Sequence, residues 1–133
     1  MAWKVGISVG LSICMHLILA IALTQNVYFD NIQNMIDLSA ITGFDWDDGN
    51  ARKSQEKHHV TQAEAEQIFF NEPLLLLQDD KHSEKEARYH AFGKTNNARK
   101  LHIAFTIREG GRLIRVISAR DMHRKERITY DKA

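Results

Sequence analysis

The chain of 133 residues contains one cysteine, Cys14, and one proline, Pro73. A single cysteine excludes a disulfide framework within the chain, offers no cysteine cluster for a metal, and argues weakly for a reducing compartment. Because the chain has one proline and only seven glycines, it has little room for a disordered linker. Its length suffices for one domain with a substantial hydrophobic core, but not for two.

Several motifs that mark large enzyme classes are also missing. The sequence has no glycine-rich phosphate loop, no nucleophile elbow and no zinc motif. No two histidines combine with a third ligand at a spacing suited to a metal. We therefore predict neither a bound metal nor a cofactor. The chain also lacks an internal repeat and a low-complexity segment.

Positive charge is scarce in the middle of the chain and abundant in its last third. Residues 35–87 hold five Lys and Arg against twelve Asp and Glu, a balance of −7. Residues 88–133 hold twelve Lys and Arg against four Asp and Glu, a balance of +8. This asymmetry indicates either a polyanionic partner for the basic part or two parts that neutralise each other across the fold.

The longest apolar run lies at the N-terminus, where residues 5–23 contain no Asp, Glu, Lys or Arg. This length just reaches a membrane span, and Ala20-Ile21-Ala22 resembles the cleavage site of a signal peptide. In a third interpretation Met35 is the functional start, because everything that looks globular follows it. We therefore divide the chain into an apolar, helix-like extension over residues 1–34 and a globular domain over residues 35–133. We expect a cytoplasmic protein or, alternatively, one anchored in a membrane through the apolar run.

Residues 101–120 predict a β-hairpin. Two runs rich in Ile and Val flank Gly110-Gly111, and both glycines can adopt positive φ in a two-residue turn. The register then follows, with these facing pairs: Arg108 and Leu113, Thr106 and Arg115, Ala104 and Ile117. One face of the hairpin is apolar and suits a core. The other carries His102, Thr106, Arg108 and Arg115, which suits either solvent or a phosphate backbone.

Caps and alternation place the remaining elements. We expect helices over residues 47–58, 61–72 and 122–132, and strands over residues 74–77 and 86–93. The four leucines of residues 74–77 alone would suit a helix equally well. The expected helix caps are Asp47 or Asp48, the capping box from Thr61 to Glu64, and Asp121. The predicted fold is α+β, with an antiparallel four-stranded sheet, two helices before it and one after it.

Residues 44–60, FDWDDGNARKSQEKHHV, resemble the opening signature of the BrnT toxin family, in which Phe-x-Trp-Asp leads to Lys-His. Later pieces follow in the family's order: an acid-rich loop with His82, Glu86-x-Arg88, Gly93, Thr106-x-Arg108, Ser118-Ala119-Arg120, and Glu126-Arg127 with Tyr130. Each piece alone is weak, but together and in order they are specific. Ser54 and His59 stand where the family usually has asparagine and glycine.

The resemblance implies the toxin of a type II toxin–antitoxin system, with a compact RelE-like fold. It further implies an endoribonuclease that cleaves RNA and inhibits translation. The implied partner is a small BrnA-type antitoxin that binds DNA through a ribbon-helix-helix domain, so that DNA would be reached only through the antitoxin. A basic sheet and C-terminal helix would then hold RNA.

Metal-independent RNA cleavage needs a base for the 2′-OH, a cation for the phosphate and an acid for the leaving 5′-oxygen. Our candidate catalytic residues are Glu86, Arg88, Arg108, Arg120 and His82. Arginine suits phosphate because its planar fork donates two parallel hydrogen bonds. Glu86 and Arg88 could equally form a structural ion pair. With a two-residue turn, Arg120 falls on the apolar face and needs a bulge or strand twist to join Arg108.

The candidate RNA-binding residues are Lys94, Arg99, Arg115, Arg124 and Arg127. Arg124, Lys125 and Arg127 form a basic helix face that is either solvated or grips phosphate or an acidic antitoxin segment. We interpret His90 and His102 as packing or rim residues, and Tyr130 as a core residue rather than a platform for a base. The rival function is a non-catalytic binding module for nucleic acid or an acidic protein.

Overall fold

The computed structural model describes residues 36–133. Cys14, the apolar run over residues 5–23 and the extension over residues 1–34 therefore lie outside the described residues. Within residues 36–133, no helix is long and apolar enough to cross a membrane. The interpretations of the N-terminus as an anchor, a signal peptide or a mis-assigned start stay predictions.

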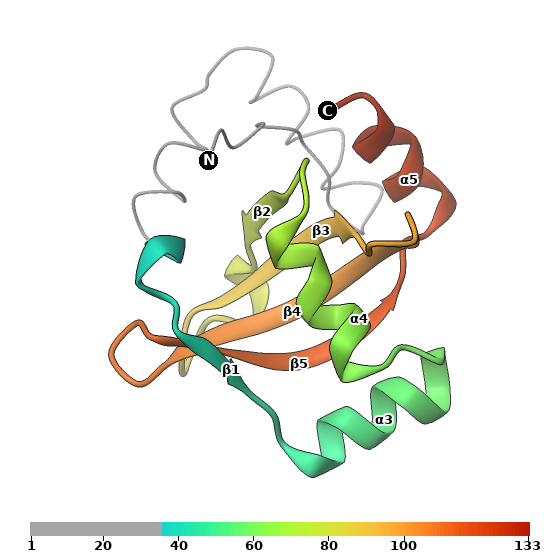
Figure 1. The fold of residues 1–133 in the computed structure, drawn as a ribbon. Coiled ribbons are helices and arrows are strands. Elements are labelled where there is room, and N and C mark those ends of the chain that lie inside the picture. The colour runs from blue at the N-terminus through green and yellow to red at the C-terminus, as the bar shows by residue number, and fades with distance from the viewer. Residues whose placement is uncertain (1–35) are drawn as a thin grey trace.

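A five-stranded sheet forms the centre of the domain (Figure 1). Its spatial order is β1 (Gly43–Asp45), β5 (Leu113–Asp121), β4 (Lys100–Arg108), β3 (Arg88–Lys94) and β2 (Leu75–Gln78). β1 is parallel to β5, and every other pair is antiparallel. The α+β prediction agrees with this fold, but the four-stranded antiparallel sheet was wrong. The strand that was not predicted is β1, which has three residues and pairs with β5, far along the chain. No local pattern reveals such a strand.

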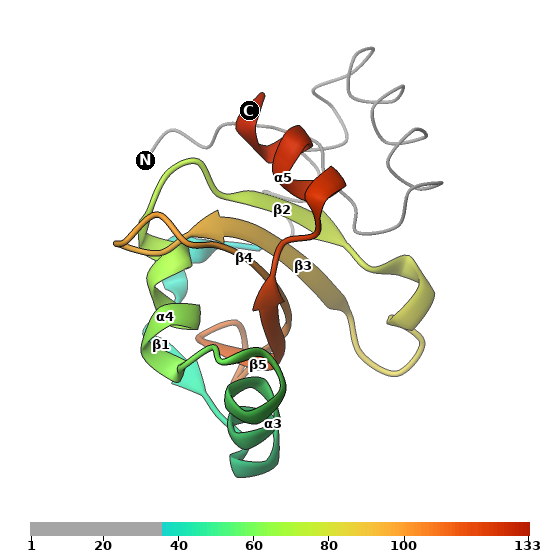
Figure 2. The ribbon, with the colours of Figure 1, turned by 90° about the vertical axis from the view of Figure 1, so that its right-hand side faces the viewer.

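Two helices cover one face of the sheet, as Figure 2 shows. α3 (Asp48–His58) is capped by Asp47, and α4 (Gln62–Gln67) begins at the predicted Thr61–Glu64 capping box. A 3₁₀ turn, η2 (Ile68–Phe70), continues α4. The core beneath these helices contains the buried side chains Val60, Ala65, Ile68, Phe69, Leu76, Tyr89, Ala91, Ile103, Phe105, Ile114, Val116 and Ala119.

The third helix, α5 (Arg124–Asp131), covers only one end of the opposite face. There it encloses a smaller core of Leu75, Leu77, Phe92, Met122 and Tyr130. The prediction that Asp121 caps this helix was wrong, because Asp121 ends β5 and accepts hydrogen bonds from Arg99. The N-cap is His123, whose N–H donates to Glu126 at 2.7 Å. The carboxylate that caps the beginning of the helix therefore belongs to buried Glu126 and not to exposed Asp121.

The hairpin between β4 and β5 differs from the prediction in two ways. Its loop has four residues, Glu109–Arg112, because the Arg112 N–H donates to the Arg108 carbonyl at 3.1 Å. Near the loop the predicted register is right, with Arg108 opposite Leu113. Beyond a β-bulge, however, Ala104 pairs with Ser118 rather than with Ile117. The extra residue in β5 reverses which face each later side chain occupies.

Candidate functional site

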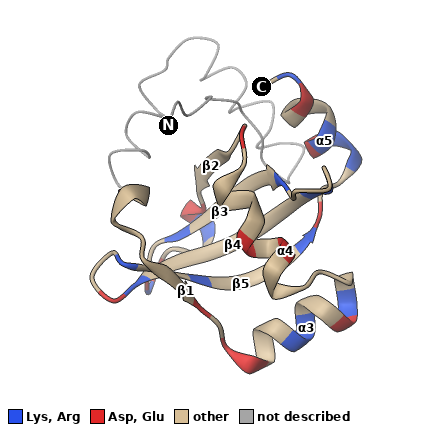
Figure 3. Ribbon diagram, viewed as in Figure 1, with Lys and Arg blue, Asp and Glu red and all other residues tan. Residues whose placement is uncertain are grey.

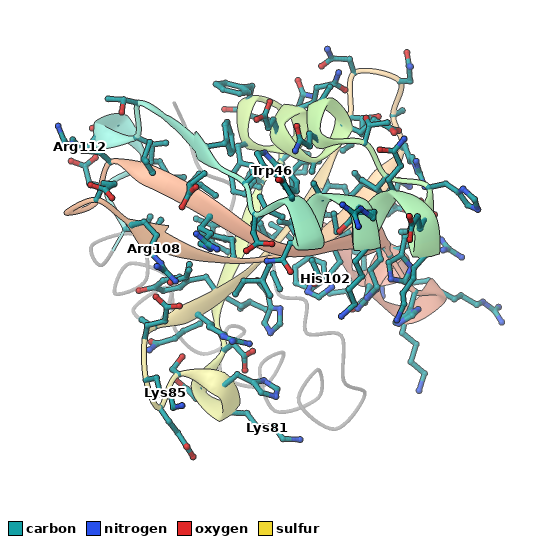
Figure 4. The ribbon with its side chains drawn as sticks, turned by 90° about the horizontal axis from the view of Figure 1, so that it is seen from below. Trp46, Lys81, Lys85, His102, Arg108 and Arg112 are labelled. Atoms are coloured by element: carbon teal, nitrogen blue, oxygen red, sulfur yellow. The ribbon has the colours of Figure 1, made fainter. Side chains whose placement is uncertain are left out.

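The face of the sheet away from α3 and α4 is covered by α5 at one end and uncovered at the other; we call this whole face the open face. Alternation along β3, β4 and β5 places these polar side chains on it: Arg88, His90, His102, Thr106, Arg108, Arg115 and Arg120. Figure 4 shows Arg108 and His102 on this side of the sheet, toward the loop that carries Lys81 and Lys85. Basic residues also mark β5 and α5, whereas acidic residues mark the start of α3 and α4 (Figure 3).

Arg108 and Glu86 form an ion pair on the open face. Arg108 Nη2 donates to Glu86 Oε1 at 2.9 Å, and the two side chains are 41% and 38% exposed. The alternative ion pair between Glu86 and Arg88 is not what the fold contains, because Glu86 lies before β3 begins and turns to β4 instead. Arg108 Nε is buried without a hydrogen-bond partner among the described residues. The Arg108 guanidinium is thus paired with the Glu86 carboxylate through Nη2, while its Nε–H has no acceptor among the described residues.

Arg88 lies beside this pair, opposite Thr106 in the ladder. Its backbone is held twice: its N–H donates to Ser83 Oγ at 3.0 Å, and its carbonyl accepts from the Asp79 N–H at 2.8 Å. Its guanidinium makes no hydrogen bond or ion pair with any residue from 36 to 133. A free guanidinium on a fixed strand is well suited to an anionic oxygen.

The bulge places Arg120 on the open face, directly opposite His102. Two hydrogen bonds, at 2.8 and 3.1 Å, join it to the fully buried carboxylate of Glu126 on α5. His102 and Arg108 are six positions apart on β4, which corresponds to about 20 Å at the usual rise of a strand. Arg120 therefore shares a face with Arg88 and Arg108 but lies at the other end of it.

His82 ends a 3₁₀ turn, η3 (Asp80–His82), between β2 and β3. Its Nδ1 lies 2.9 Å from Asp79 Oδ2, and its side chain is 56% exposed. The same carboxylate oxygen lies 3.3 Å from His90 Nε2. The loop is joined to β3 because Ser83 Oγ accepts from the N–H of Arg88. His82 is thus held near the beginning of β3, where Arg88 and Glu86 are.

His90 and His102 form a connected pair that the sequence interpretation missed. His102 Nε2 and His90 Nδ1 lie 2.7 Å apart, and the His102 ring stacks on Phe92 with centroids 4.6 Å apart. Burial lowers the pKa of His102 well below its usual range, and burial also lowers the pKa of His90, although the Asp79 charge opposes that shift. Both rings are therefore neutral near pH 7.

Two of the predicted RNA-binding arginines hold the fold together. Arg99 donates to Asp121, Glu64 and the His58 and His59 carbonyls, which joins the beginning of β4 to the α3–α4 junction. Hydrogen bonding to Asp121 raises the pKa of Arg99 above its usual value. Arg115 binds Asp45 at 2.9 Å and Asp47 at 3.2 Å, which fixes β1 against β5. The structure thus gives both side chains intramolecular partners.

Of the other three predicted RNA-binding residues, two lie on α5 and one lies at the end of β3. Lys94 is half-buried at the end of β3, and Arg124 and Arg127 are exposed on the helix. Arg127 Nη1 donates to the Met122 carbonyl at 2.6 Å. Tyr130 is a core residue, as predicted: its hydroxyl donates to the Pro73 carbonyl at 2.6 Å, and burial raises its pKa to about 12. Within residues 36–133, no group of three or more His, Cys, Asp or Glu could hold a metal ion.

The fold and this site define a class: a small α+β domain whose sheet has one face packed under helices and the other left polar and rich in arginine. The family model described as "Ribonuclease toxin, BrnT, of type II toxin-antitoxin system" matches residues 46–126, more than half of the chain. The chain therefore belongs to the BrnT family of ribonuclease toxins of type II toxin–antitoxin systems. The matched residues include every candidate named above except Arg127.

A solved structure is also similar to this chain: the 1.1 Å crystal structure of the Brucella abortus ribonuclease toxin, BrnT. The two sequences are 19% identical, the match covers 62% of this chain and 97% of that chain, and the TM-score is 0.45. No curated protein matches the sequence. Because the identity and TM-score are both low, the family assignment depends on the family model alone.

Proposed function

We propose that this protein is a metal-independent endoribonuclease that cleaves RNA on the open face, beside the beginning of β3. The observation that carries the proposal is the grouping of three features around one strand end: the Arg88 guanidinium, which has no partner among residues 36–133, the Arg108–Glu86 ion pair and the carboxylate-bound His82. This grouping offers a cation, a base and an acid. Those are the three functions that RNA cleavage requires, because RNA supplies its own nucleophile.

The proposed reaction begins when the Glu86 carboxylate removes the proton of the ribose 2′-OH. The 2′-oxygen then forms a bond to phosphorus, the negative charge on the phosphate oxygens grows, and Arg88 and Arg108 stabilise it. The bond from phosphorus to the 5′-oxygen breaks, and that oxygen takes a proton from protonated His82. The products are a 2′,3′-cyclic phosphate and a free 5′-OH, with the proton gained by Glu86 balancing the one lost by His82.

Glu86 has two roles in this scheme. In the free protein its carboxylate is paired with Arg108 at 2.9 Å. When a phosphate oxygen binds Arg108, it competes with Glu86 for the guanidinium, and the carboxylate is released toward the sugar. Since both side chains are partly exposed, this exchange requires little desolvation.

The far end of the open face binds RNA rather than reacting with it. Arg120 lies about 20 Å from Arg108 along β4, so it contacts a different phosphate. Arg124 and Arg127 extend the positive surface along α5, and Lys94 adds a positive charge at the end of β3. Arg99 and Arg115 support this surface from within, because each is paired with two carboxylates, whereas Arg120 is paired with one. Binding through several phosphates makes affinity fall steeply with salt.

The partner we propose is a BrnA-type antitoxin with a ribbon-helix-helix domain, which silences the toxin by covering the open face. DNA is then contacted through the antitoxin only. Inhibition of translation follows from RNA cleavage, and the site of action is the cytoplasm, unless residues 5–23 anchor the chain in a membrane. An acidic antitoxin segment suits a face that carries Arg88, Arg108 and Arg120.

The test is induction of the full chain in bacterial cells, with growth and RNA integrity followed over time. We expect growth arrest with new RNA fragments from the wild type and neither from Arg108→Ala. The matched control is Arg52→Ala, because Arg52 is an exposed arginine on α3, away from the open face. Growth without RNA fragments from a folded wild type, or equal toxicity of Arg108→Ala, would overturn the proposal in favour of a non-catalytic binding module.

A further inference from the structure

The ladder between β2 and β3 opens at the strand end where the proposed site lies. The last regular pair of this ladder is Gln78 with Tyr89. The next pair in the same register is Asp79 with Arg88, and an antiparallel pair at such a position normally exchanges two backbone hydrogen bonds. One of them forms, because the Asp79 N–H donates to the Arg88 carbonyl at 2.8 Å. The loop of residues 79–87 extends from the sheet at this point (Figure 2).

The hydroxyl of Ser83 takes the place of the second bond. Ser83 Oγ accepts from the Arg88 N–H at 3.0 Å and donates to the Asp79 carbonyl. A hydroxyl has one proton to donate and lone pairs that accept, so both bonds form at once. Because an oxygen atom lies between them, the Arg88 N–H and the Asp79 carbonyl are held further apart than a direct hydrogen bond would hold them. We call this arrangement the Ser83 bridge.

A second hydroxyl, that of Thr106, holds the same peptide unit from the opposite side. The carbonyl of this unit belongs to Ala87 and accepts from Thr106 Oγ1 at 2.8 Å, and its N–H is the Arg88 N–H of the Ser83 bridge. Thr106 is 2% exposed on β4 and lies directly opposite Arg88 in the ladder. Both polar groups of one peptide unit are thus bonded to side-chain hydroxyls, one from the loop and one from β4.

This peptide unit lies between two residues of the proposed site. Ala87 packs against the core beneath α3 and α4, so the side chains before and after it, Glu86 and Arg88, both project to the open face. Glu86 is paired there with Arg108 at 2.9 Å. A rotation of the peptide unit between Ala87 and Arg88 would therefore displace the base and a cation of the proposed reaction together.

The Ser83 bridge also connects the turn that carries His82 to this peptide unit. The His82 N–H lies 3.3 Å from the Asp79 carbonyl and 3.3 Å from Asp79 Oδ1, and it donates to both. The Asp79 carbonyl therefore accepts from the His82 N–H and from the Ser83 hydroxyl. Through this one carbonyl, the turn that presents the His82 ring is joined to the backbone of Arg88.

We propose that Ser83 and Thr106 are positioning residues for RNA cleavage: their hydroxyls fix the peptide unit before Arg88, and so hold Arg88 and Glu86 in place beside His82. This inference rests on the proposed function for its chemistry, but the hydrogen bonds of the two hydroxyls do not depend on it. Neither hydroxyl takes part in a covalent step or binds RNA. Their loss therefore lowers the rate at which bound RNA is cleaved and leaves the affinity for RNA unchanged.

The first measurement is hydrogen exchange of the Arg88 amide, followed by NMR of the full chain. This amide should exchange about 10-fold faster in Ser83→Ala than in the wild type, because its acceptor is gone. Ser83→Thr keeps the hydroxyl and should restore slow exchange. Equal exchange in the wild type and in a folded Ser83→Ala protein would overturn the proposal, because the backbone would then hold Arg88 without the hydroxyl.

The second measurement combines single-turnover cleavage of a mixed-sequence RNA oligonucleotide with a binding titration. Ser83→Ala and Thr106→Val should each slow the cleavage of bound RNA by about 10-fold, with affinity within about twofold of the wild type. Ser83→Thr and Thr106→Ser keep the hydroxyls and should recover most of the rate. The matched control is Thr129→Val, which removes a buried hydroxyl that donates to the Lys125 carbonyl within α5 and should leave the rate unchanged.

Together the two measurements separate this inference from the proposed function. If the wild type cleaves no RNA but the Arg88 amide responds as expected, the proposed function fails, and the hydroxyls are supported as the groups that fix this strand end. If the wild type cleaves RNA and Ser83→Ala and Thr106→Val cleave it equally fast, the inference fails and ribonuclease activity stands. A loss confined to affinity would also overturn the inference, because the hydroxyls would then bind RNA.

Discussion

The two faces of one sheet in this protein obey different rules. On the covered face, alternating apolar side chains pack under α3 and α4. On the open face, arginines, histidines and a threonine occupy the intervening positions of the same strands. The covered face stabilises the fold by burying apolar surface, and one apolar residue there can be replaced by another of similar volume. The open face depends on which side chain stands beside which, so a shift of one residue changes its chemistry.

The first way to sharpen this comparison is to damage the covered face. Phe105 is fully buried between Phe69 and Tyr89, with ring centroids 5.3 and 5.6 Å away. Phe105→Ala should lower the free energy of unfolding by about 3–5 kcal/mol, which is a large part of the stability of a small domain. Urea unfolding of the full chain measures this loss. A loss below 1 kcal/mol would mean that the covered face is not the main core.

The next largest effect should come from a change on the open face that leaves stability alone. Glu86→Gln keeps the shape of the side chain but removes the proposed base. RNA cleavage should slow by about 100-fold or more, while affinity for RNA stays within a few-fold. Single-turnover cleavage and a binding titration separate the two quantities. Equal rates for Glu86→Gln and the wild type would exclude Glu86 as the base.

A residue that both stabilises the fold and holds a side chain of the open face should give an intermediate result. Glu126 is fully buried, caps α5 and binds Arg120 at 2.8 and 3.1 Å. Glu126→Gln should lower stability by about 2 kcal/mol, because it weakens a charge-assisted pair. It should also weaken RNA binding by loosening Arg120, with little change in the cleavage rate of bound RNA. Thermal unfolding and salt-dependent binding provide the two measurements.

Stability should depend on pH through the buried histidines. Burial lowers the folded-state pKa of His90 and of His102, so below about pH 6.5 the unfolded chain binds more protons than the folded chain. This contribution to stability is therefore fully present above about pH 6.5 and is lost as the pH falls below it. Urea unfolding at pH 7.5, 6 and 5 tests this. His102→Phe should flatten the curve, whereas His59→Asn should not.

The smallest expected effect concerns metal removal. Because the proposed chemistry uses Glu86, Arg88, Arg108 and His82 alone, EDTA should leave the cleavage rate within twofold of its original value. The assay is single-turnover cleavage after dialysis against chelator. A large loss of rate that Mg²⁺ or Zn²⁺ restores would contradict the metal-independent mechanism.

The sequence allowed good predictions where structure follows from local signals. The capping box at Thr61 and Glu64, the N-cap at Asp47 and the alternation around Phe105 depend on residues a few positions apart. β1 was missed because its three residues become a strand only by pairing with β5. Asp121 was misassigned as a cap because Arg99, in the turn immediately before β4, binds its carboxylate.

The open face was only half predictable for the same reason. Arg88 and Arg108 were expected together, and the turn near Arg108 has the expected register. The face on which Arg120 lies depends on the β-bulge in β5, whose position no local pattern predicts. The predicted register did show that Arg120 could join Arg108 only through a bulge or strand twist. His90 and His102 were interpreted as packing residues because each was considered within its own strand. Pairing β3 with β4 through the short turn between them would have brought both rings to one face.

The most direct test of the central claim is single-turnover cleavage of RNA by the full chain and by Arg88→Ala, with Arg52→Ala as the control. The Arg88 guanidinium has no hydrogen-bond or ion-pair partner among residues 36–133, so its removal should leave stability unchanged. The account predicts that cleavage slows by about 100-fold or more in Arg88→Ala, with most RNA affinity retained, and that Arg52→Ala matches the wild type. Unchanged cleavage in Arg88→Ala, or a loss of affinity with no change in the rate of bound RNA, would contradict it.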